Sequence, residues 1–356
     1  METLITRSAL VLPKKIPALV RPDAWPRPDH PEELTSIQKA NEIMFEFALK
    51  LTPFLFETAE RRIGTQFTGE VQGREGEDFK IGIDSKAGSS GKRILVKLCG
   101  EYDLPLYVRS EHGHFTIGKG KPELTLTIDD YDNSREYEFE ADTPGHTVAT
   151  IWDKNDNPIT TIDGNVFRKH LIIMRNGINY FYNPHTKEFI TLPFVPEVES
   201  IEDHRFAVAS YDGSPKYSGP FHANLDDMND DRSRDGLFHG KSGAHTYGQM
   251  AKAGLNGKGI MAYPIFREPI TEALPGWPLA HAAGFKAFSV DVEDGFMREF
   301  KPNISFYIEN PERYMIDRIP FLIVARTTAL ARQIRDYAFR KTFGDWLGFK
   351  GKEEFG

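Results

Sequence analysis

The sequence is poor in cysteine: Cys99 is the only one among its 356 residues. A disulfide within the chain is therefore excluded, and so is a structural zinc site that needs several thiolates. Such sparing use of cysteine is typical of proteins that fold in a reducing cytoplasm. Cys99 follows residues 94–98, which are apolar except for Lys97, and this predicts a thiol packed within a strand rather than a reactive nucleophile.

Long hydrophobic runs are also lacking. No segment approaches the roughly 18 consecutive apolar residues that a transmembrane helix needs, and the best candidate, residues 319–325, is far too short. Residues 1–17 mix basic side chains with short apolar runs and contain no continuous hydrophobic core of a signal peptide. These absences predict a soluble, cytoplasmic protein, or a particle assembled in the cytoplasm.

An excess of positive charge is missing as well. The 52 acidic and 44 basic residues give a formal net charge of −8, which argues against sequence-independent nucleic-acid binding as the main task. A hydrophobic content of 40% and a charged content of 27% are ordinary for a chain that buries a core. The 26 Phe, 13 Tyr, 23 Pro and 30 Gly favour a turn-rich protein that contains sheet over a helical bundle.

Local patterns divide the chain into five segments. In order they are a proline-rich extended arm, a helical pair, an antiparallel β domain, a loop-rich segment and a helical C-terminal region, at residues 1–33, 34–64, 65–196, 197–309 and 310–356. Prolines between positions 13 and 31 forbid regular structure in the arm, while Trp25 and other interleaved apolar residues favour an arm that lies on another surface over a disordered linker. Thr52-Pro53 restarts the helical pattern, which predicts two helices rather than one.

The segment from residue 67 to residue 194 carries the strongest structural signal. Short runs of β-branched and aromatic residues alternate with turn clusters, as at 79–83, 93–98 and 124–128. Asn176-Gly177 between two such runs predicts a tight hairpin. We therefore expect a mainly β fold with flanking helices (α+β), built on a central antiparallel sandwich or barrel. A long basic helix is predicted near the C-terminus, at about 320–346.

The segment 197–309 has little hydrophobic periodicity but is rich in histidine, aspartate and glycine. Imidazole and carboxylate groups suit zinc, iron or manganese. The candidate metal ligands are His204, His222, His239, His245 and Asp227. A metal-free alternative uses His239 as a base whose tautomer is set by Asp235, the nearest carboxylate in the sequence. The remaining interpretation is that these histidines are dispersed and meet solvent, backbone or another chain.

Two motifs in this segment are incomplete. Gly240-Lys241-Ser242 has the end of a phosphate-binding loop, but Asp235 stands where the loop needs an earlier glycine. The run that begins at Asp227 alternates oxygen ligands as a calcium loop does, but Arg232 occupies the place of the required glycine. Neither a P-loop nor an EF-hand is therefore predicted.

The functional hypothesis from the sequence rests on the predicted architecture rather than on a catalytic motif. An extended arm, a multistranded core and terminal helices are typical of subunits that interlock, so the preferred hypothesis is a structural or assembly protein, such as a viral or phage particle component. Its expected partners are copies of itself or other assembly subunits, and no cofactor is expected. The alternative is a hydrolase or transferase that uses residues 201–266, with or without a divalent metal. A third hypothesis is a β-sandwich module that binds sugar or peptide.

Overall fold

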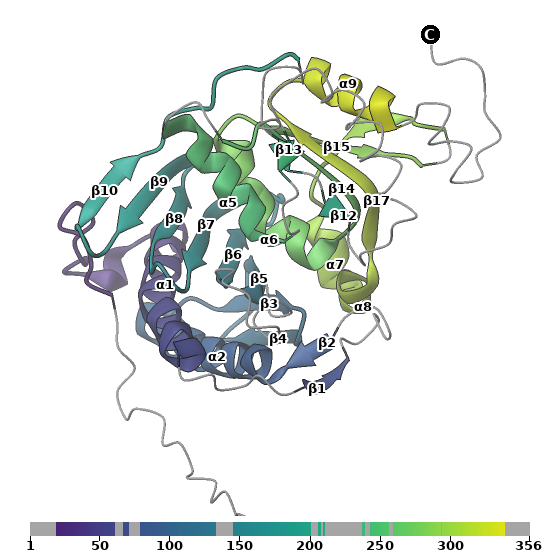
Figure 1. Cartoon of the computed structure of the whole chain (residues 1–356). Coiled ribbons are helices and arrows are strands. Elements are labelled where there is room, and N and C mark those ends of the chain that lie inside the picture. The colour runs from purple at the N-terminus through teal and green to yellow at the C-terminus, as the bar shows by residue number, and fades with distance from the viewer. Residues whose placement is uncertain are drawn as a thin grey trace, which may run out of the picture.

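The computed structural model describes residues 19–60, 67–70, 79–132, 145–200, 206–207, 209–210, 237–238, 243–255, 259–292 and 294–338 (Figure 1). Its helices are the 3-10 turns Pro31–Glu33 and Ala253–Leu255 and the α-helices α1 (Ser36–Glu60), α2 (Gly82–Tyr102), α5 (His245–Lys252), α6 (Ile270–Ala282), α7 (Ile304–Glu309), α8 (Pro311–Ile316) and α9 (Thr328–Ala338). No described helix is long and apolar enough to cross a membrane.

The strands form two large sheets and two short pairings. The eight-stranded sheet has the order β10-β9-β8-β7-β6-β5-β3-β4, and the five-stranded sheet has the order β12-β14-β17-β15-β16. The strands of the first are β3 (Leu106–Ser110), β4 (Gly113–Ile117), β5 (Leu124–Asp132), β6 (His146–Trp152), β7 (Pro158–Asn165), β8 (Leu171–Arg175), β9 (Ile178–Asn183) and β10 (Glu188–Thr191). Those of the second are β12 (Ala209–Ser210), β14 (Ala262–Pro269), β15 (Lys286–Val290), β16 (Met297–Glu299) and β17 (Arg318–Ala325). The short pairs join β1 (Phe67–Glu70) to β2 (Phe79–Ile81) and β11 (Phe206–Ala207) to β13 (Leu237–Phe238).

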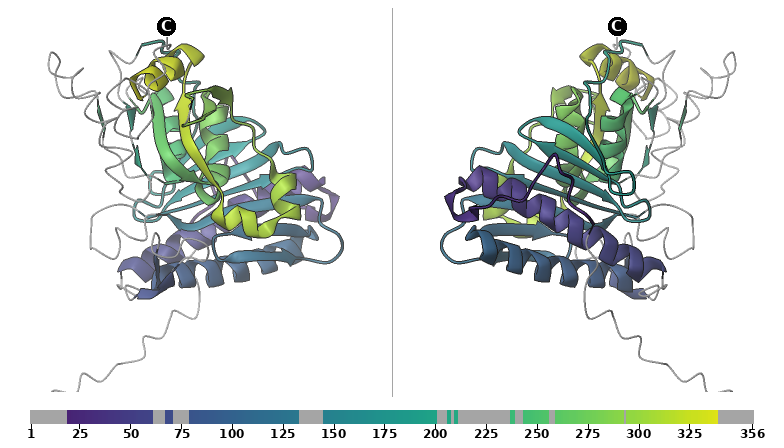
Figure 2. Two further views of the ribbon diagram at one scale, coloured as in Figure 1. Left: turned by 90° about the vertical axis from the view of Figure 1, so that its right-hand side faces the viewer. Right: turned by 90° about the vertical axis from the view of Figure 1, so that its left-hand side faces the viewer.

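Helices and sheets alternate in layers. Helices α1 and α2 pack side by side on one face of the eight-stranded sheet, and α6 packs on the other face against β5 to β8 (Figure 2). On its far side α6 contacts β14 and β15 of the second sheet, which α9 covers in turn. Two buried hydrophobic clusters fill the two sides of the large sheet. The predicted class, mainly β with flanking helices, is confirmed. The strands form an open sheet with β10 and β4 at its edges, however, where their spacing had suggested a sandwich or barrel.

The predicted helical pair is a single helix. Helix α1 runs through Pro53, although proline in a helix interior removes an N–H and costs about 3 kcal/mol. Phe54 and Leu55 next to it are buried, and α1 packs on β6 and β7. Burying such a side chain contributes roughly 1.5–3 kcal/mol. The packing of several of them therefore outweighs the proline penalty and keeps the helix continuous.

The strands predicted at 79–83 and 93–98 are also corrected. Only Phe79–Ile81 is a strand, and α2 follows it. Buried side chains recur along α2 every three or four residues, at Ile83, Ala87, Ser90, Ile94, Leu98 and Tyr102. Local β-branched content thus hid a helical period. Cys99 is buried as predicted, but in a helix.

The predicted C-terminal helix is divided between β17 and α9. Five consecutive residues of β17, from Phe321 to Ala325, are buried. A strand that is covered on both faces shows a continuous apolar run, which periodicity does not distinguish from a buried helix. The same reason applies to the segment expected to be loop-rich, which contributes β14, α6 and β15 to the core.

Two other predictions concern the arm and the hairpin. The described part of the arm packs on α1: the Trp25 indole N–H donates to Glu42 at 2.7 Å, and its ring stacks on Phe45 at 4.4 Å between centroids. Residues 1–18 lie outside the described residues.

The predicted hairpin is confirmed, because Asn176 and Gly177 have φ of 50° and 76° between paired strands β8 and β9.

Candidate functional site

The last residues of β5 place three carboxylates in the middle of the large sheet. Asp129, Asp130 and Asp132 are 7%, 4% and 6% exposed. β5 lies between β3, to which it is parallel, and β6, to which it is antiparallel. Its register with β6 shifts between Asp129 and Asp132. Such an irregularity interrupts the strict alternation of side chains and is frequent beside active sites.

Two further carboxylates come from other elements. Glu111 lies in the turn between β3 and β4, and Glu272 lies in the first turn of α6. Burial raises the pKa of Asp129 well above its ordinary value, and the negative charges of Asp132, Glu111, Glu272 and Asp130 raise it further. We call these five residues the acidic cluster. Like charges are gathered here in a buried place, which is costly unless a cation or proton compensates them.

Asp130 faces the α2 side of the sheet and has its own partners. Burial raises the pKa of Asp130 to about 6, although His112 and a hydrogen bond from Ser110 oppose the rise. His112 Nε2 is 3.9 Å from Asp130 Oδ2 and 3.5 Å from Glu111 Oε1. His112 therefore lies where a positive charge would balance part of the acidic cluster.

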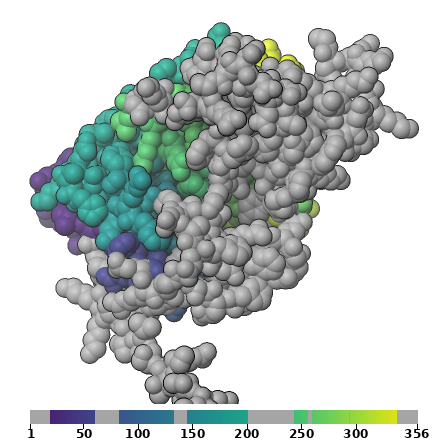
Figure 3. All heavy atoms as spheres, viewed as in Figure 1, coloured from purple at the N-terminus to yellow at the C-terminus, as the bar shows by residue number. Residues whose placement is uncertain are grey.

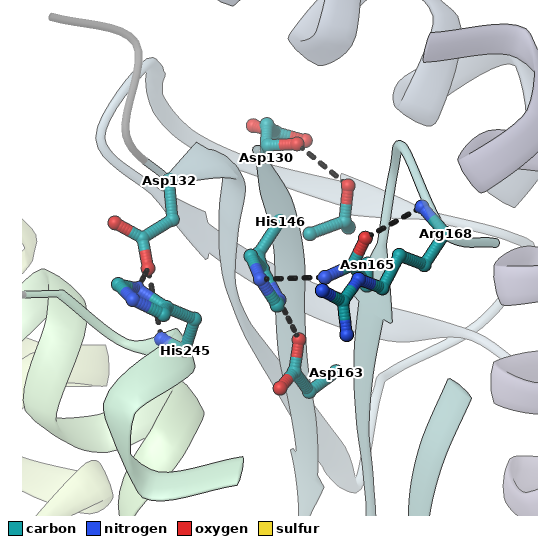
Figure 4. Close-up of polar contacts among 8 residues, drawn as sticks. Asp130, Asp132, His146, Asp163, Asn165, Arg168 and His245 are labelled. Carbon is teal, nitrogen blue, oxygen red and sulfur yellow. Dashed lines mark hydrogen bonds and ion pairs between the residues drawn. The ribbon is translucent and has the colours of Figure 1, made fainter. Parts of the chain in front are cut away.

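Asp132 is enclosed by the turn that starts α5. The backbone N–H of His245 donates to Asp132 Oδ2 at 2.8 Å, and His245 Nδ1 lies 2.7 Å from the same oxygen (Figure 4). Burial alone would raise the pKa of Asp132, but the charge and hydrogen bonds of His245 outweigh it and the pKa is lowered. A Cβ atom on Gly243, whose φ is +152°, would clash with Asp132 Oδ1. Asp132 Oδ2 is thus held by His245, and Oδ1 lies so close to Gly243 that no side chain fits there.

A second aspartate–histidine pair lies beside the first. His146 Nδ1 is 2.5 Å from Asp163 Oδ1, and His146 Nε2 is 3.2 Å from the amide of Asn165 (Figure 4). The ring centroids of His146 and His245 are 4.8 Å apart, with a 30° tilt. Both histidines and both aspartates are buried. They come from β5, β6, β7 and α5, so this polar group joins α5 to the large sheet.

Buried phenols extend the polar region toward the second sheet. The hydroxyl of Tyr247 donates to Glu268 Oε1 at 2.6 Å, and the Gly243 N–H donates to the Tyr263 hydroxyl at 3.3 Å. Burial, followed by the charge of Glu268, raises the pKa of both tyrosines well above the ordinary value. These phenols therefore stay protonated at neutral pH and act as hydrogen-bond groups. In the space-filling view the green surface that begins at residue 243 adjoins the teal surface of residues 145–200 (Figure 3).

Most candidates from the sequence lie outside the described residues. These are His204, His222, His239, Asp227 and Asp235, so the interpretation as dispersed side chains and the alternative of a metal or catalytic site both stay predictions. His245 is described, and Asp132 is one of its partners. The acidic cluster was missed, because Glu111 and Glu272 are far from β5 in the sequence. The one local signal was Asp129-Asp130-Tyr131-Asp132 at the end of an apolar strand.

Possible metal-binding side chains come close together at one place in the described part of the chain. One group there, His30, Glu32 and Glu33, brings three ligand atoms within 4.8 Å of one another, and all three residues are exposed. Exposed acidic groups of this kind are common without an ion. No three described carboxylates of the acidic cluster meet the same limit, so an ion there would need side-chain rotation to contact three of them.

Solved structures share this fold along most of the chain. The extragenic suppressor protein SuhB of Bartonella henselae has a TM-score of 0.55 and 11% identity, over 84% of this chain and 98% of that one. A staphylococcal inositol monophosphatase, soaked in lithium chloride, has a TM-score of 0.56 and 9% identity, over 86% and 97%. Fructose-1,6-bisphosphatase of Leishmania major has a TM-score of 0.56 and 13% identity, over 88% and 96%.

Sequence comparison adds nothing to this likeness: no family model and no curated protein matches the chain. At these identities the structural likeness establishes the fold. It also corrects the preferred hypothesis from the sequence. Several solved structures that share this architecture bear the names of phosphatases, and the interpretation as a structural assembly protein was therefore wrong. Analogy from an arm and terminal helices failed because such features do not identify a function.

Proposed function

We propose that this protein is a divalent-metal-dependent hydrolase of phosphate monoesters. The observation that carries the proposal is the acidic cluster, which gathers buried carboxylates from β5 and α6 with the partly buried Glu111 of the turn after β3. The fold supports the same chemistry, since inositol monophosphatases and a fructose-1,6-bisphosphatase share it. Their names suggest that the substrate is a phosphorylated polyol or sugar.

Glu111, Asp129 and Glu272 are the residues that would hold the metal. Carboxylate oxygens are the protein ligands that Mg²⁺ prefers, and the negative charges of Glu111 and Glu272 both raise the pKa of Asp129. A cation would relieve that repulsion, so the donor set fits. We leave out Asp132, because its Oδ2 already contacts both the backbone N–H and Nδ1 of His245. Asp130 is left out because it has Ser110 and His112 as partners.

A divalent cation bound there would act as a Lewis acid on the phosphoryl group. The protein's own part is to hold two of the three carboxylates on a strand and a helix, while Glu111 lies in the short turn between β3 and β4. Asp129 is fixed in a central strand, and Glu272 in the first turn of α6. α6 is itself held by Thr150, whose hydroxyl donates to the Pro275 carbonyl at 2.7 Å. Ligands on strands and helices keep their geometry better than ligands on loops.

Phosphate release by the purified full-length protein tests the proposal. We expect hydrolysis of inositol 1-phosphate, fructose 1,6-bisphosphate or p-nitrophenyl phosphate in the presence of Mg²⁺ or Mn²⁺, and its loss with EDTA. Asp129→Asn and Glu272→Gln should lower kcat/KM by about 10²-fold or more, since they remove charges that act in the transition state. Glu188→Gln, at an exposed position of β10, is the matched control and should leave activity unchanged. Absence of metal-dependent release from all three esters would refute the proposal.

A further inference from the structure

Basic side chains gather at the end of α5. Arg168 and His170 lie in the short connection between β7 and β8, and Lys252 is the last residue of α5. Lys252 Nζ lies 5.1 Å from the centre of the Phe181 ring, and the His170 ring stands nearly perpendicular to that ring with 5.1 Å between centroids. We call Arg168, His170 and Lys252 the basic cluster. Such a group of positive charges contrasts with the formal net charge of −8 of the whole chain.

Hydrogen bonds fix the connection between β7 and β8. The Asn165 N–H donates to the His170 carbonyl at 2.9 Å, and the Arg168 N–H donates to Asn165 Oδ1 at 2.8 Å (Figure 4). Lys169 has a φ of 56° and places its Nζ 3.8 Å from the centre of the Phe56 ring of α1, on the other face of the sheet. The turn therefore directs Lys169 to one face and His170 to the other.

In the described part of the chain, the charges that act on this cluster are mainly positive. Burial lowers the pKa of His170, and the positive charges of Lys252, Arg168 and His185 lower it further. Burial also lowers the pKa of Lys252; the negative charge of Asp163 opposes this change and the charge of Arg168 adds to it. Asp163 is itself paired with a histidine of β6. An anion bound here would therefore relieve repulsion, as a cation would in the acidic cluster.

We propose that the basic cluster is a second site of the protein, which binds a phosphate group. Ammonium and guanidinium groups are the side chains that proteins use most for this anion. Lys252 supplies a compact positive charge, and Arg168 supplies a planar set of N–H donors. His170 adds a ring N–H on the same side of the sheet as Lys252. Binding of this kind needs no hydrolysis, so the inference goes beyond the proposed function.

The basic cluster lies along the same edge of the large sheet as the acidic cluster. Asp132, His146 and Asn165 are paired in a row across β5, β6 and β7, and neighbouring strands are about 4.8 Å apart. Helix α5 begins beside Asp132 and ends at Lys252, about 10 Å further on at the rise of an α-helix. A ligand with two phosphate groups at such a separation would reach both clusters, whereas a smaller phosphorylated compound would occupy the basic cluster alone.

Binding of inorganic phosphate to the metal-free, full-length protein tests this site. In EDTA the acidic cluster repels anions, so titration calorimetry reports the basic cluster alone. We expect saturable binding by wild type, and a Kd that is higher by about tenfold or more in Lys252→Met and in Arg168→Gln. Lys169→Met is the matched control, because it removes a lysine of the same turn that faces α1. Its Kd should stay within about twofold of wild type, since water and salt screen a charge at that distance.

The choice of variants separates a lost charge from lost packing. Lys252→Met keeps an apolar stem against Phe181, and Lys252→Arg keeps the charge as well and should retain phosphate binding. Arg168 is exposed, so Arg168→Gln should unfold at the same temperature as wild type. The inference is overturned if wild type binds no phosphate, if both cluster variants bind it as wild type does, or if Lys169→Met loses as much affinity as Lys252→Met.

Activity with Mg²⁺ then identifies the source of the phosphate group. If it is the second phosphate of a substrate, Lys252→Met should raise KM for fructose 1,6-bisphosphate by about tenfold or more and leave KM for inositol 1-phosphate unchanged. If it belongs to a separate compound, both KM values should stay at the wild-type level although phosphate binding in EDTA is lost. An equal rise for both esters would place Lys252 at the metal centre and overturn a separate site. Absence of activity would refute the proposed function and leave the binding test unaffected.

Discussion

At the scale of single residues, Gly243 tests how tightly the turn before α5 encloses Asp132. An alanine there would place its Cβ against Asp132 Oδ1, at a φ of +152° that side chains rarely adopt. We expect Gly243→Ala to lower the free energy of unfolding by about 1 kcal/mol or more. Urea unfolding measures this. Gly100→Ala is the matched control: Gly100 lies in α2 with open space around it, so the change should stabilise by roughly 0.5–1 kcal/mol. Equal effects of the two substitutions would contradict the account of the turn.

Cys99 gives a second prediction at this scale. Burial raises the pKa of its thiol to about 12. The thiolate is the reactive species, so a raised pKa together with burial slows reaction at neutral pH. Native protein should therefore react with Ellman's reagent only after denaturation. Ser89→Cys adds an exposed thiol to the same helix and should react at once; rapid reaction of native wild type would show that Cys99 is accessible.

Residues whose role depends on local sequence could be predicted, whereas residues whose role depends on tertiary packing could not. Asn176 and Gly177 could be assigned to a hairpin because the turn's requirement for positive φ is local. The inert character of Cys99 was predictable from its apolar neighbours. Glu111 and Glu272 were not predictable as site residues, because only the pairing of β3 with β5 and the packing of α6 on β5 bring them to Asp129.

At the scale of elements, the segment before α1 is held to the body by Trp25. Trp25 is 4% exposed and contacts Glu42, Phe45 and the guanidinium of Arg175. Truncating a buried tryptophan typically costs about 3–5 kcal/mol, so Trp25→Ala should markedly lower the midpoint of thermal unfolding. Val20→Ala changes a side chain that is 59% exposed and should shift stability by less than about 0.5 kcal/mol. A Trp25→Ala protein as stable as the wild type would favour the linker interpretation of this segment.

Elements were predicted well where turn residues mark the ends of short strands, and poorly where a long apolar run lacks such markers. The antiparallel strands from β6 to β9 were recognised from turn residues and alternation. β17 was taken for helix because its run from Phe321 to Ala325 is buried throughout. The sequence of α2 was predicted to form strands, because its glycines and β-branched residues are typical of strands and turns. They obscured the helical spacing of its buried residues.

For the whole molecule, metal binding should appear as stability. An ion that binds the native state but not the unfolded chain stabilises by about 2.7 kcal/mol at 100 times its Kd. We expect Mg²⁺ or Mn²⁺ to raise the unfolding temperature of wild type. Asp129→Asn should abolish that rise and, by removing one of several repelling charges, should also make the metal-free protein more stable than metal-free wild type. If metal-free Asp129→Asn is less stable than metal-free wild type, the carboxylates around Asp129 do not destabilise the native protein by repulsion, and the argument for a metal site there fails.

The location of the ion tests the central claim most directly. Crystals grown with Mn²⁺ and measured for anomalous scattering would place the metal without reference to any substrate. The account predicts a peak within ligand distance of carboxylate oxygens of Glu111, Asp129 and Glu272, at the end of β5. A crystal with no peak there, or with manganese only at the exposed group His30, Glu32 and Glu33, would contradict it.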